Sequence, residues 1–453
     1  MTECIQDRLA FSSAPGRREI VAEFSGGTIS SDAGGLLLQE TDAKMDLLSR
    51  FSRCFFDGRN PILIEHSVEQ MVRQRVYALA LGYEDLNDHD QLRQDPLLGL
   101  MAGKADPGTE PLAGKSTLNR MELGAGMPSR YKKISFWRDS VDQLLVDVFL
   151  EAHPVAPEEI VLDIDTTDLA LHGQQEGRFY HGHYGHYCYL PLYIFCGDHV
   201  LCARLRPSSI GPAVGSKKEV DRIVRQIRLR WPEVRIVVRG DSGFCADELM
   251  TWCEQNRVGY VLGMARNRRL ERLIAGALLE AKQQFESTQQ PARIFVEFEH
   301  ETLSGSWSRK RRVVAKAEHI DGKSNPRFIV TSVDAESWEK RKLYEELYCA
   351  RGDMENRIKE QFVLFADRVS ASTMRANQLR IYLSVIAYTL MSGLRRLGLQ
   401  GTALAMAQVG TIRLRLLKIG ALVRVTVRKV WVRMASSYPR QALFAQVVQQ
   451  LRQ

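Results

Sequence analysis

The order of short apolar strands and amphipathic helices between Ile160 and Met264 constrains the fold of this chain more than any other feature. Gly197 and Asp198 separate the second strand from the third, which is typical of the turn of an antiparallel hairpin. Helices connect the later strands, as parallel strands require. The predicted elements are strands 160–164, 189–196 and 199–205, helix 216–230, strand 234–238, helix 246–256 and strand 258–264. This order predicts an α/β protein built on a mixed sheet.

The segments on either side differ in character. Residues 1–153 are predicted to be mostly helical, and Pro154 marks the change to strand-rich sequence. A basic helical piece at 266–272 precedes alternating apolar and polar residues, which indicate antiparallel strands. Residues 371–453 are predicted to be helical, with a basic run from Arg413 to Arg433. The expected division is a helical N-terminal region at 1–153, the first part of a core at 154–264, a β-rich insertion at 265–333, the closing part of the core at 334–370, and a helical basic region at 371–453.

Two predicted strands lead into aspartates that are candidate metal ligands. Asp165 follows the first strand, and Asp241 follows the fourth. If these strands are neighbours, both carboxylates emerge at one edge of the sheet. A third carboxylate, Glu355, is expected on a helix that closes over that edge. Converging oxygen ligands that leave positions open for water and phosphate are what Mg²⁺ requires.

Each aspartate also has a simpler interpretation. Asp241 could form the turn that begins at Ser242-Gly243, and Asp165 could cap a turn or a helix. Asp163 competes with Asp165 for the role of first carboxylate, because side chains two residues apart on a strand share one face. Asp165 is preferred because Thr166-Thr167 follows it at the strand end.

The segment YCARGDMENRIKE, from Tyr348 to Glu360, is predicted to form the helix that carries the third carboxylate. At 100° per residue, a narrow stripe of this helix collects an aromatic side chain, two cations and a carboxylate: Tyr348, Arg351, Glu355 and Lys359. Apolar residues lie beside the stripe, so the helix would pack along one edge. The stripe is either a solvated salt-bridge face or a phosphate-binding surface beside the metal ligands.

Together these features resemble the RNase H-like core of the DDE transposases, over roughly residues 20 to 435. The spacing of Tyr348, Arg351 and Glu355 resembles the Y-R-E-K signature of the cut-and-paste insertion-sequence transposases of bacteria. One position departs from the signature: its lysine falls seven residues after the glutamate, where this chain has Phe362, and the available lysine is Lys359. Further similar segments are D-x-T at 165–167, HGQQEGRFYHGHYGHYCYLPLY at 172–193 and RGDSGF at 239–244.

The resemblance implies roles for particular residues. Asp165, Asp241 and Glu355 would bind two Mg²⁺ or Mn²⁺ ions, which hold the attacking and leaving oxygens of a phosphodiester in line. Tyr348 and Arg351 would contact DNA phosphates beside the cleaved bond. Lys359 would be a further DNA contact, on the same helical face.

The β-rich insertion resembles the one that grips the transposon end in relatives and receives a flipped base. Trp307, which precedes the basic run Arg309–Arg312, is chemically suited to stack on a base. The alternative is an ordinary tryptophan that packs on the sheet.

The function implied is a transposase that binds the terminal inverted repeats of its element, cleaves them and joins the 3′-OH ends to target DNA. The helical region 1–153 is expected to bind the DNA ends, and the basic region 371–453 to bind DNA or to join two copies. A homodimer is expected in the complex with double-stranded DNA. Two alternatives remain: a stand-alone metal-dependent nuclease of the same fold, and a DNA-binding repressor derived from a transposase. The insertion and the basic helical regions favour transposition, and the presence of all three carboxylates argues against a repressor.

Composition is compatible with this interpretation. The chain of 453 residues is long enough for two to three domains, and its net charge of +8 is compatible with a nucleic-acid partner. No apolar run of about 18 residues appears, and MTECIQDRLA lacks the apolar region of a signal peptide, so a cytoplasmic, nucleoid-associated protein without membrane contact is expected. The eight cysteines are scattered without a C-x-x-C pair, which argues against a zinc ribbon or a disulfide framework.

Three histidines in one loop offer a different metal site. His181, His183 and His186 lie within six residues and could bind zinc. No cysteine or carboxylate at ligand spacing completes the set, and the resemblance places this segment in a loop near DNA.

Overall fold

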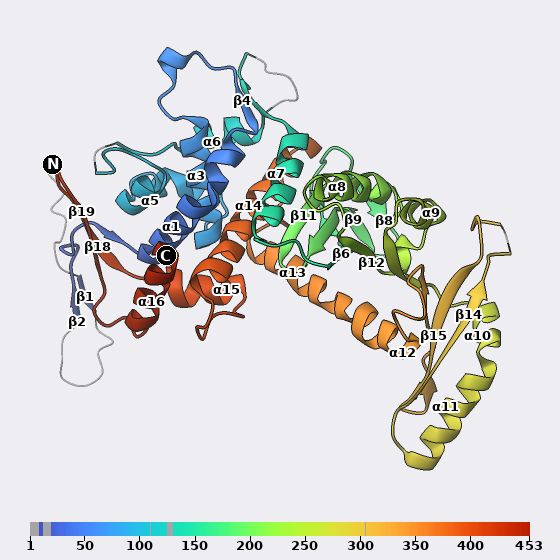
Figure 1. Ribbon diagram of the computed structural model, residues 1–453. Coiled ribbons are helices and arrows are strands. Elements are labelled where there is room, and N and C mark those ends of the chain that lie inside the picture. The colour runs from blue at the N-terminus through green and yellow to red at the C-terminus, as the bar shows by residue number, and fades with distance from the viewer. Residues whose placement is uncertain (1–8, 12–19, 109, 125–129, 304) are drawn as a thin grey trace. The chain divides into compact units, whose positions relative to one another are not determined.

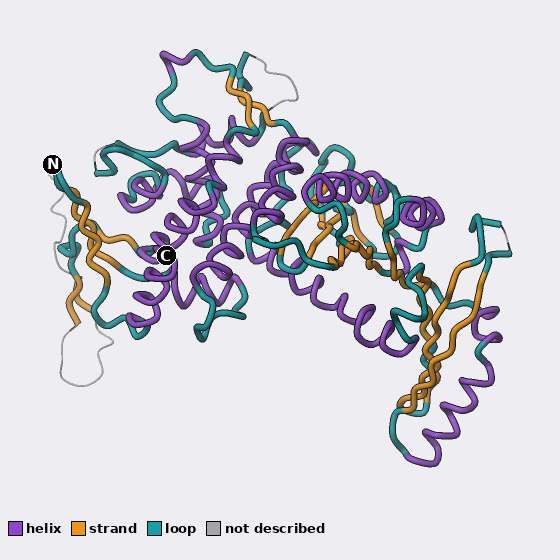
Figure 2. The backbone as a smooth tube through the Cα atoms, in the orientation of Figure 1, coloured by secondary structure: helices purple, strands orange, loops and turns teal. Residues whose placement is uncertain are grey.

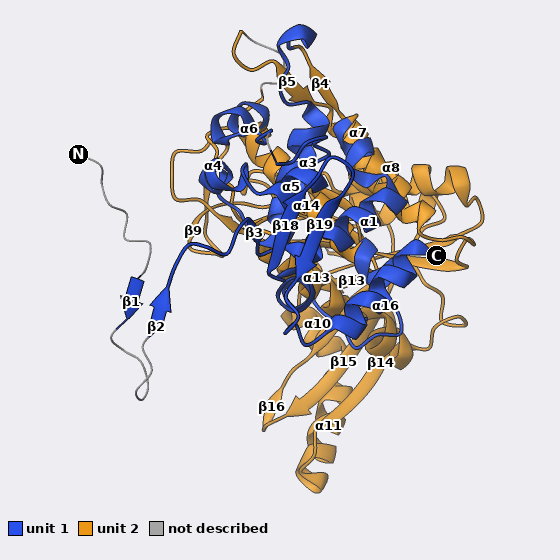
Figure 3. Ribbon diagram, turned by 90° about the vertical axis from the view of Figure 1, so that its left-hand side faces the viewer, with its two compact units in different colours: residues 1–52, 59–121, 393–453 blue, residues 53–58, 122–392 orange. Residues whose placement is uncertain are grey.

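The computed structural model describes residues 9–11, 20–108, 110–124, 130–303 and 305–453. The chain divides into two units, shown in different colours in Figure 3. Unit 1 comprises residues 1–52, 59–121 and 393–453, and unit 2 comprises residues 53–58 and 122–392. Residues from both ends of the chain therefore share unit 1, whereas the predicted core and its insertion fall together in unit 2.

Unit 1 combines helices with short strands (Figure 1). Its helices are α1 Leu36–Met45, α2 Leu47–Ser52, α3 Val68–Leu81, α4 His89–Leu92, α5 Pro96–Met101, α6 Lys115–Glu122, α15 Val409–Ile412 and α16 Gln441–Arg452, with short turns η1 Ala33–Gly35, η2 Pro61–Leu63, η3 Leu86–Asp88 and η7 Arg413–Leu417. Its strands are β1 Leu9–Phe11, β2 Ile20–Ala22, β3 Ile29–Ser30, β18 Ala421–Val425 and β19 Val430–Met434.

The prediction of an entirely helical C-terminal region was wrong for the second half of its basic run. β18 and β19 form an antiparallel hairpin that pairs with β3. The physical reason is the alternation in ALVRVTVRKVWVRM, where β-branched residues recur with the period of a strand. The basic side chains are exposed on this hairpin: Arg424, Arg428, Lys429 and Arg433.

Unit 2 contains the large sheet and the helices around it (Figure 2). Its strands are β4 Phe55–Asp57, β5 Ile134–Phe136, β6 Glu159–Thr166, β7 Leu169–Ala170, β8 Phe179–His181, β9 His186–Tyr189, β10 Leu192–Cys196, β11 His199–Arg204, β12 Arg235–Gly240, β13 Gly259–Met264, β14 Ala292–His300, β15 Arg311–Ile320, β16 Lys323–Ser324 and β17 Arg327–Thr331. Its helices and turns are α7 Arg138–Glu151, α8 Ser216–Arg230, η4 Ser242–Phe244, α9 Asp247–Gln255, α10 Arg268–Leu273, α11 Ala275–Thr288, α12 Lys340–Lys342, η5 Leu343–Tyr348, η6 Cys349–Arg351 and α13 Gly352–Val363. The long helix α14, Met374–Gly398, begins in unit 2 and ends in unit 1.

The predicted strands and helices between 160 and 264 are present in the predicted order. The segment predicted as a loop after the first strand also contains β7, β8 and the start of β9, which form a small sheet of their own. In the described residues, one sheet runs in the order β11-β10-β6-β12-β13-β17-β15-β14, with β16 attached to β15. β6 pairs with β12 in parallel and with β10 antiparallel, and β12 pairs with β13 in parallel. The predicted antiparallel strands of the insertion are present, and β17 joins them to β13 so that they extend the same sheet.

The two faces of this sheet are covered differently. Alternate strand residues such as Leu162 and Val238 face a core that α7, α8 and α9 complete. Val237 faces the opposite side, where Leu343 and Leu347 of the segment before α13 pack on the sheet. Val161 belongs to this second face, so the alternation of a strand places Asp163 and Asp165 there as well.

Among the described residues, no helix combines the length and apolar character needed to cross a membrane. The seven cysteines of this part of the chain have free thiols. Cys4 and the first eight residues, on which the signal-peptide expectation rests, lie outside the described residues.

Candidate active site

The parallel pairing of β6 and β12 brings the two aspartates to one edge of the sheet. Ile164 on β6 is paired with Gly240 on β12, and the next residue on each strand is an aspartate. Asp165 and Asp241 therefore leave the sheet side by side. The prediction that these two strands are neighbours is confirmed.

Asp163, the competing first carboxylate, is occupied by a buried ion pair. Its two oxygens accept hydrogen bonds from Nε and Nη2 of Arg239, at 2.5 and 2.7 Å. The same guanidinium donates from Nη1 to the carbonyl oxygen of Leu347 at 2.5 Å. Burial raises the pKa of Asp163, while Arg239 opposes that shift. Asp163 therefore ties β6 to β12 and, through Arg239, to the segment that precedes Tyr348.

Asp165 is half-buried and less completely paired. Nη1 of Arg351 lies 3.3 Å from its Oδ2, and its Oδ1 accepts the N–H of Thr166 at 2.8 Å. Burial raises the pKa of Asp165 to about 6, and the negative charges of Asp241 and Glu355 add to the increase. A carboxyl group whose charged form is this poorly compensated gains from the approach of a cation.

Asp241 also forms the turn that its simpler interpretation predicts, since its Oδ1 accepts the N–H of Gly243 at 2.8 Å. The Tyr348 hydroxyl lies close to this turn. A Cβ built on Gly263 would lie 2.6 Å from that hydroxyl oxygen and 2.8 Å from the backbone nitrogen of Ser242. Glycine at 263 thus permits the close approach of β13, the Asp241 turn and the tyrosine.

The segment predicted as one α-helix from 348 to 360 is not uniform. A π-helical turn at Leu343–Tyr348 is followed by a 3₁₀ turn at Cys349–Arg351, and the α-helix begins only at Gly352. The Arg239 guanidinium provides a physical reason, because it takes the Leu347 carbonyl that a regular helix would use for the amide of residue 351. Such a change of helix type is frequent at functional sites.

Glu355 and Lys359 form the exposed end of the predicted stripe. They lie on α13 with the Lys359 Nζ 2.8 Å from a Glu355 oxygen, and the side chains of Lys359 and Glu355 are 63% and 69% exposed. The hydrogen bond and the positive charge of Lys359 lower the pKa of Glu355. The shared face of these two residues agrees with the prediction, and in this structure the pair is a solvated salt bridge.

The donor chemistry of the site fits a hard cation, but its geometry is incomplete. Carboxylate oxygens are the ligands that Mg²⁺ prefers, and Asp165 is short of compensating charge. However, the described part of the chain has no group of three or more His, Cys, Asp or Glu side chains placed to hold a metal ion. Arg351 lies against Asp165, and Lys359 holds Glu355. The structure brings together Asp165, Asp241, Tyr348 and Arg351, and Glu355 is near enough for its charge to act on Asp165.

Trp307 has the simpler of its two predicted roles in this structure. Its side chain is only 9% exposed and belongs to the core of the sheet. The ring packs edge-on against His300, with centroids 5.7 Å apart, and Arg311 lies over it at 5.5 Å. The tryptophan is therefore not presented as a stacking platform.

Among the described residues, the histidines of the glycine-rich loop belong to no group of three or more side chains that could hold a metal ion. His181 ends β8 and His186 begins β9, and these strands pair with each other. The Nε2 of His186 lies 2.8 Å from Oδ2 of Asp168. This contact stabilises the loop behind the strand that carries Asp165.

Arg239 is the site residue whose role sequence reasoning missed. It lies within the similar segment RGDSGF, directly before Gly240 and Asp241. The signal was a cation directly after the apolar run Ile236–Val238 of β12, opposite a strand that carries Asp163 in an equally apolar setting. A cation in such a position requires a buried partner.

Comparison with known proteins defines the class. The chain matches the family described as transposase DDE domain group 1 over residues 12–453. The protein is therefore a transposase, an enzyme that acts on DNA, and it belongs to DDE domain group 1. No curated protein matches the sequence.

Among solved structures, one match is the cryo-EM structure of the piggyBac transposase synaptic complex with hairpin DNA. The two chains are 10% identical, with a TM-score of 0.42. The match covers 86% of this chain and 80% of the other.

Proposed function

We propose that this transposase works by cut-and-paste chemistry on the terminal inverted repeats of a bacterial insertion sequence, in the branch with the Y-R-E-K signature. It binds these repeats as double-stranded DNA, cleaves them and joins the 3′-OH ends to target DNA. The observation that supports this most is the parallel β6–β12 pairing, which continues into Asp165 and Asp241. Tyr348 and Arg351 accompany the two carboxylates, as the signature requires. The β11-β10-β6-β12-β13 order supports an RNase H-like core, with the segment 265–333 as its insertion.

Two Mg²⁺ or Mn²⁺ ions are the proposed cofactors, held by Asp165, Asp241 and Glu355. When bound, such ions supply charge stabilisation to both oxygens of an in-line phosphodiester displacement. The family and the raised pKa of Asp165 support this assignment. Two salt bridges oppose it, Arg351–Asp165 and Lys359–Glu355, so loading the site requires both to open. Released from Asp165, the planar guanidinium of Arg351 is suited to bind a phosphate at two points.

DNA contacts are proposed for Tyr348, Arg351 and Lys359. Tyr348 offers a hydroxyl beside the Asp241 turn, and the two cations lie near the carboxylates they pair with. The helical regions that flank the core are proposed to add end recognition or to join two copies into the expected homodimer. Light scattering of the protein with and without terminal-repeat DNA measures the molar mass, which shows whether two copies are present.

The test combines a gel shift with a cleavage assay on a labelled element end, in the presence and absence of Mg²⁺. The wild-type protein should bind the end without metal, cleave it at a defined position with metal, and join it to target DNA. Asp241→Ala should keep binding and lose cleavage, because binding comes mainly from basic and polar contacts elsewhere.

Other outcomes identify other functions. Cleavage at random positions indicates a stand-alone nuclease, and binding without cleavage indicates a repressor. Full cleavage by Asp241→Ala contradicts the assignment of the site.

A further inference from the structure

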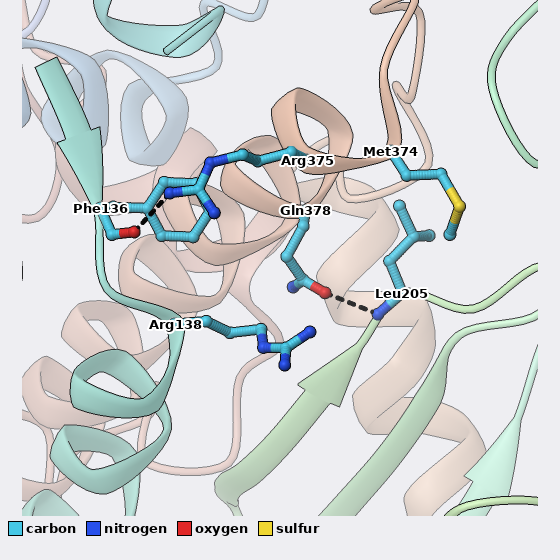
Figure 4. A pocket seen from close by; sticks show the side chains of 6 residues that line it. All are labelled: Phe136, Arg138, Leu205, Met374, Arg375 and Gln378. Atoms are coloured by element: carbon cyan, nitrogen blue, oxygen red, sulfur yellow. Dashed lines mark hydrogen bonds between the residues drawn. The ribbon is translucent and has the colours of Figure 1, made fainter. Parts of the chain in front are cut away.

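A cavity of about 210 Å³ lies in unit 2, away from the three carboxylates of the proposed site. Figure 4 shows its lining residues as sticks. Two of these residues are arginines and none is acidic: Phe136, Arg138, Leu205, Met374, Arg375 and Gln378. A concave site that gathers two cations without a carboxylate in its lining is suited to an anion.

Arg375 is held in place with one donor unused. Its Nη2 donates to the carbonyl oxygen of Phe136 at 2.5 Å, and its guanidinium lies 4.3 Å from the centre of the Phe136 ring. Its Nε is buried and has no hydrogen-bond partner. Burial, and then the positive charge of Arg138, lower the pKa of Arg375. An anion in the cavity would accept a hydrogen bond from the unused Nε of Arg375. It would also reduce the repulsion between the two arginines.

Arg138 is weakly compensated by its surroundings. The Asp139 carboxylate lies at 4.0 Å and is 86% exposed, so water screens this pair. Arg138 begins helix α7, whose first turn has no side-chain cap on its N–H groups, and this end of a helix favours negative charge. The first amide of α14, at Met374, is already taken by the Glu176 carboxylate at 3.0 Å. The available positive potential therefore comes from the arginines and from α7.

The strand register places this cavity along the edge that carries Asp165. Leu192 on β10 is paired with Thr166 on one side and with Arg204 on the other. Leu205, which lines the cavity, thus follows its strand at the same edge as Asp165, two strand spacings or about 10 Å across the sheet. A DNA strand rises about 3.4 Å per nucleotide, so it covers this distance within a few nucleotides.

Two exposed aromatic side chains lie in or next to the same pair of strands as the cavity residue Phe136. Phe56 and Trp137 are 41% and 53% exposed, and their ring centres lie 6.2 Å apart. They belong to the paired strands around β4 and β5, next to the basic and aromatic sequence RYKKISFWR at 130–138. Aromatic faces interleaved with cations are the usual surface for unstacked bases beside a phosphate backbone.

We propose that the Arg138–Arg375 cavity binds a backbone phosphate of the DNA strand that enters the Asp165–Asp241 site, a few nucleotides from the cleaved bond. The proposal rests on the proposed function, because it takes this edge of the sheet as the path of the DNA. Phe56 and Trp137 contact the neighbouring bases or sugars.

Arg138→Ala tests the phosphate contact directly. The probe is a labelled duplex of random sequence, whose affinity is measured as a function of salt concentration. The variant should bind about tenfold more weakly at low salt, as expected for loss of a charged hydrogen bond. The slope of log affinity against log salt should fall by about 0.9, which is one phosphate contact. Arg138→Lys should restore part of the slope.

The matched control is Arg235→Ala. Arg235 is also an exposed arginine with a weak carboxylate contact, Glu159 at 3.4 Å, but it begins β12 and so lies at the opposite edge of the sheet. It should leave both affinity and slope unchanged. Arg375 also contacts the Phe136 carbonyl and ring, so Arg375→Ala would disturb the fold as well as the cavity. Arg375→Lys is therefore used instead. The unfolding midpoint of every variant is measured alongside its DNA affinity.

Three results overturn the proposal. Wild-type affinity and slope for Arg138→Ala, with Asp241→Ala inactive in cleavage, would remove this contact and leave the proposed function standing. Failure of the wild-type protein to bind any DNA would remove both. Stabilisation by sulfate that Arg138→Ala abolishes, with DNA binding unchanged, would assign the cavity to a small anion instead.

Discussion

The two halves of the candidate active site are built in opposite ways. On the sheet side, Asp163 and Arg239 form a buried, two-point ion pair that fixes β6, β12 and the carbonyl of Leu347 together. On the helix side, Glu355 and Lys359 form an exposed pair on α13. The sheet side is held by interactions that are costly to break, whereas the helix side can exchange partners with water. We infer that the sheet positions the reaction and that α13 adapts to ligands.

Among the proposed substitutions, Asp163→Ala is expected to lower the unfolding free energy the most, because it removes one half of the buried pair. Removing one member of a buried pair leaves Arg239 charged and unsatisfied, which costs about 3–5 kcal/mol of unfolding free energy. Chemical denaturation measures the loss. The double variant Asp163→Leu with Arg239→Met should recover much of it, because it leaves no buried charge. A loss under about 0.5 kcal/mol for Asp163→Ala would mean that the pair does not hold the two strands.

Asp165→Asn should stabilise the protein in a pH-dependent way. The folded pKa of about 6 lies above the ordinary value of 3.8, so the folded state binds more protons between these values. The contribution of Asp165 to stability therefore falls as pH rises from about 4 to 6. Above that range the asparagine variant should be more stable by about 3 kcal/mol, and below about pH 4 the advantage should vanish.

Unfolding midpoints across this pH range measure the Asp165 effect. Asp334→Asn is a control of opposite sign, because hydrogen bonds from Ser337 lower the pKa of the exposed Asp334. That substitution should remove stability that is present above about pH 4. If Asp165→Asn is no more stable than the wild-type protein at neutral pH, the claim that the Asp165 charge is poorly compensated is wrong.

Gly263→Ala tests the contact between the sheet and Tyr348. The added Cβ would meet the Tyr348 hydroxyl at 2.6 Å and two backbone atoms of the Asp241 turn at 2.8 and 3.1 Å. Overpacking of this kind costs about 1–3 kcal/mol and should slow cleavage by displacing the turn. Gly276→Ala, in α11 with open space around it, should be neutral or stabilising. Equal behaviour of the two variants would show that the approach at Gly263 is not tight.

Substitutions on α13 should have the smallest effect on stability. Lys359→Ala should leave the unfolding midpoint at the wild-type value, because the pair it breaks is solvated. In single-turnover cleavage it should also be better tolerated than Arg351→Lys, which keeps the charge but loses the guanidinium fork. If Arg351→Ala cleaves at the wild-type rate, the stripe of Tyr348, Arg351, Glu355 and Lys359 is only a solvated salt-bridge face.

The sequence predicted the sheet well because its signals are local. Apolar runs that end at Asp165 and Asp241, with helices between the later strands, predict parallel neighbours without knowledge of distant contacts. The change of helix type at Tyr348 could not be predicted in this way. It depends on Arg239 reaching the Leu347 carbonyl, 108 residues away in sequence.

The missed features share this dependence on distant partners or on competing signals. Trp307 is followed by a basic run that favours a DNA contact, but the strands that bury it become neighbours only in the folded sheet. In the C-terminal region, the prediction of a helix followed the basic run and missed the alternating valines, which form the strands β18 and β19. The metal assignment remains a proposal: the described residues contain no group of three ligating side chains placed to hold a metal ion, and Glu355 is paired with Lys359.

The most direct test of the account compares Asp165→Asn with Asp163→Asn in single-turnover cleavage of a labelled element end, at a temperature where both proteins are folded. The account assigns reaction chemistry to Asp165 and structural pairing to Asp163. Asp165→Asn should therefore be folded, bind the end and fail to cleave, while Asp163→Asn should cleave in proportion to its folded fraction. A folded, inactive Asp163→Asn beside an active Asp165→Asn would contradict the account.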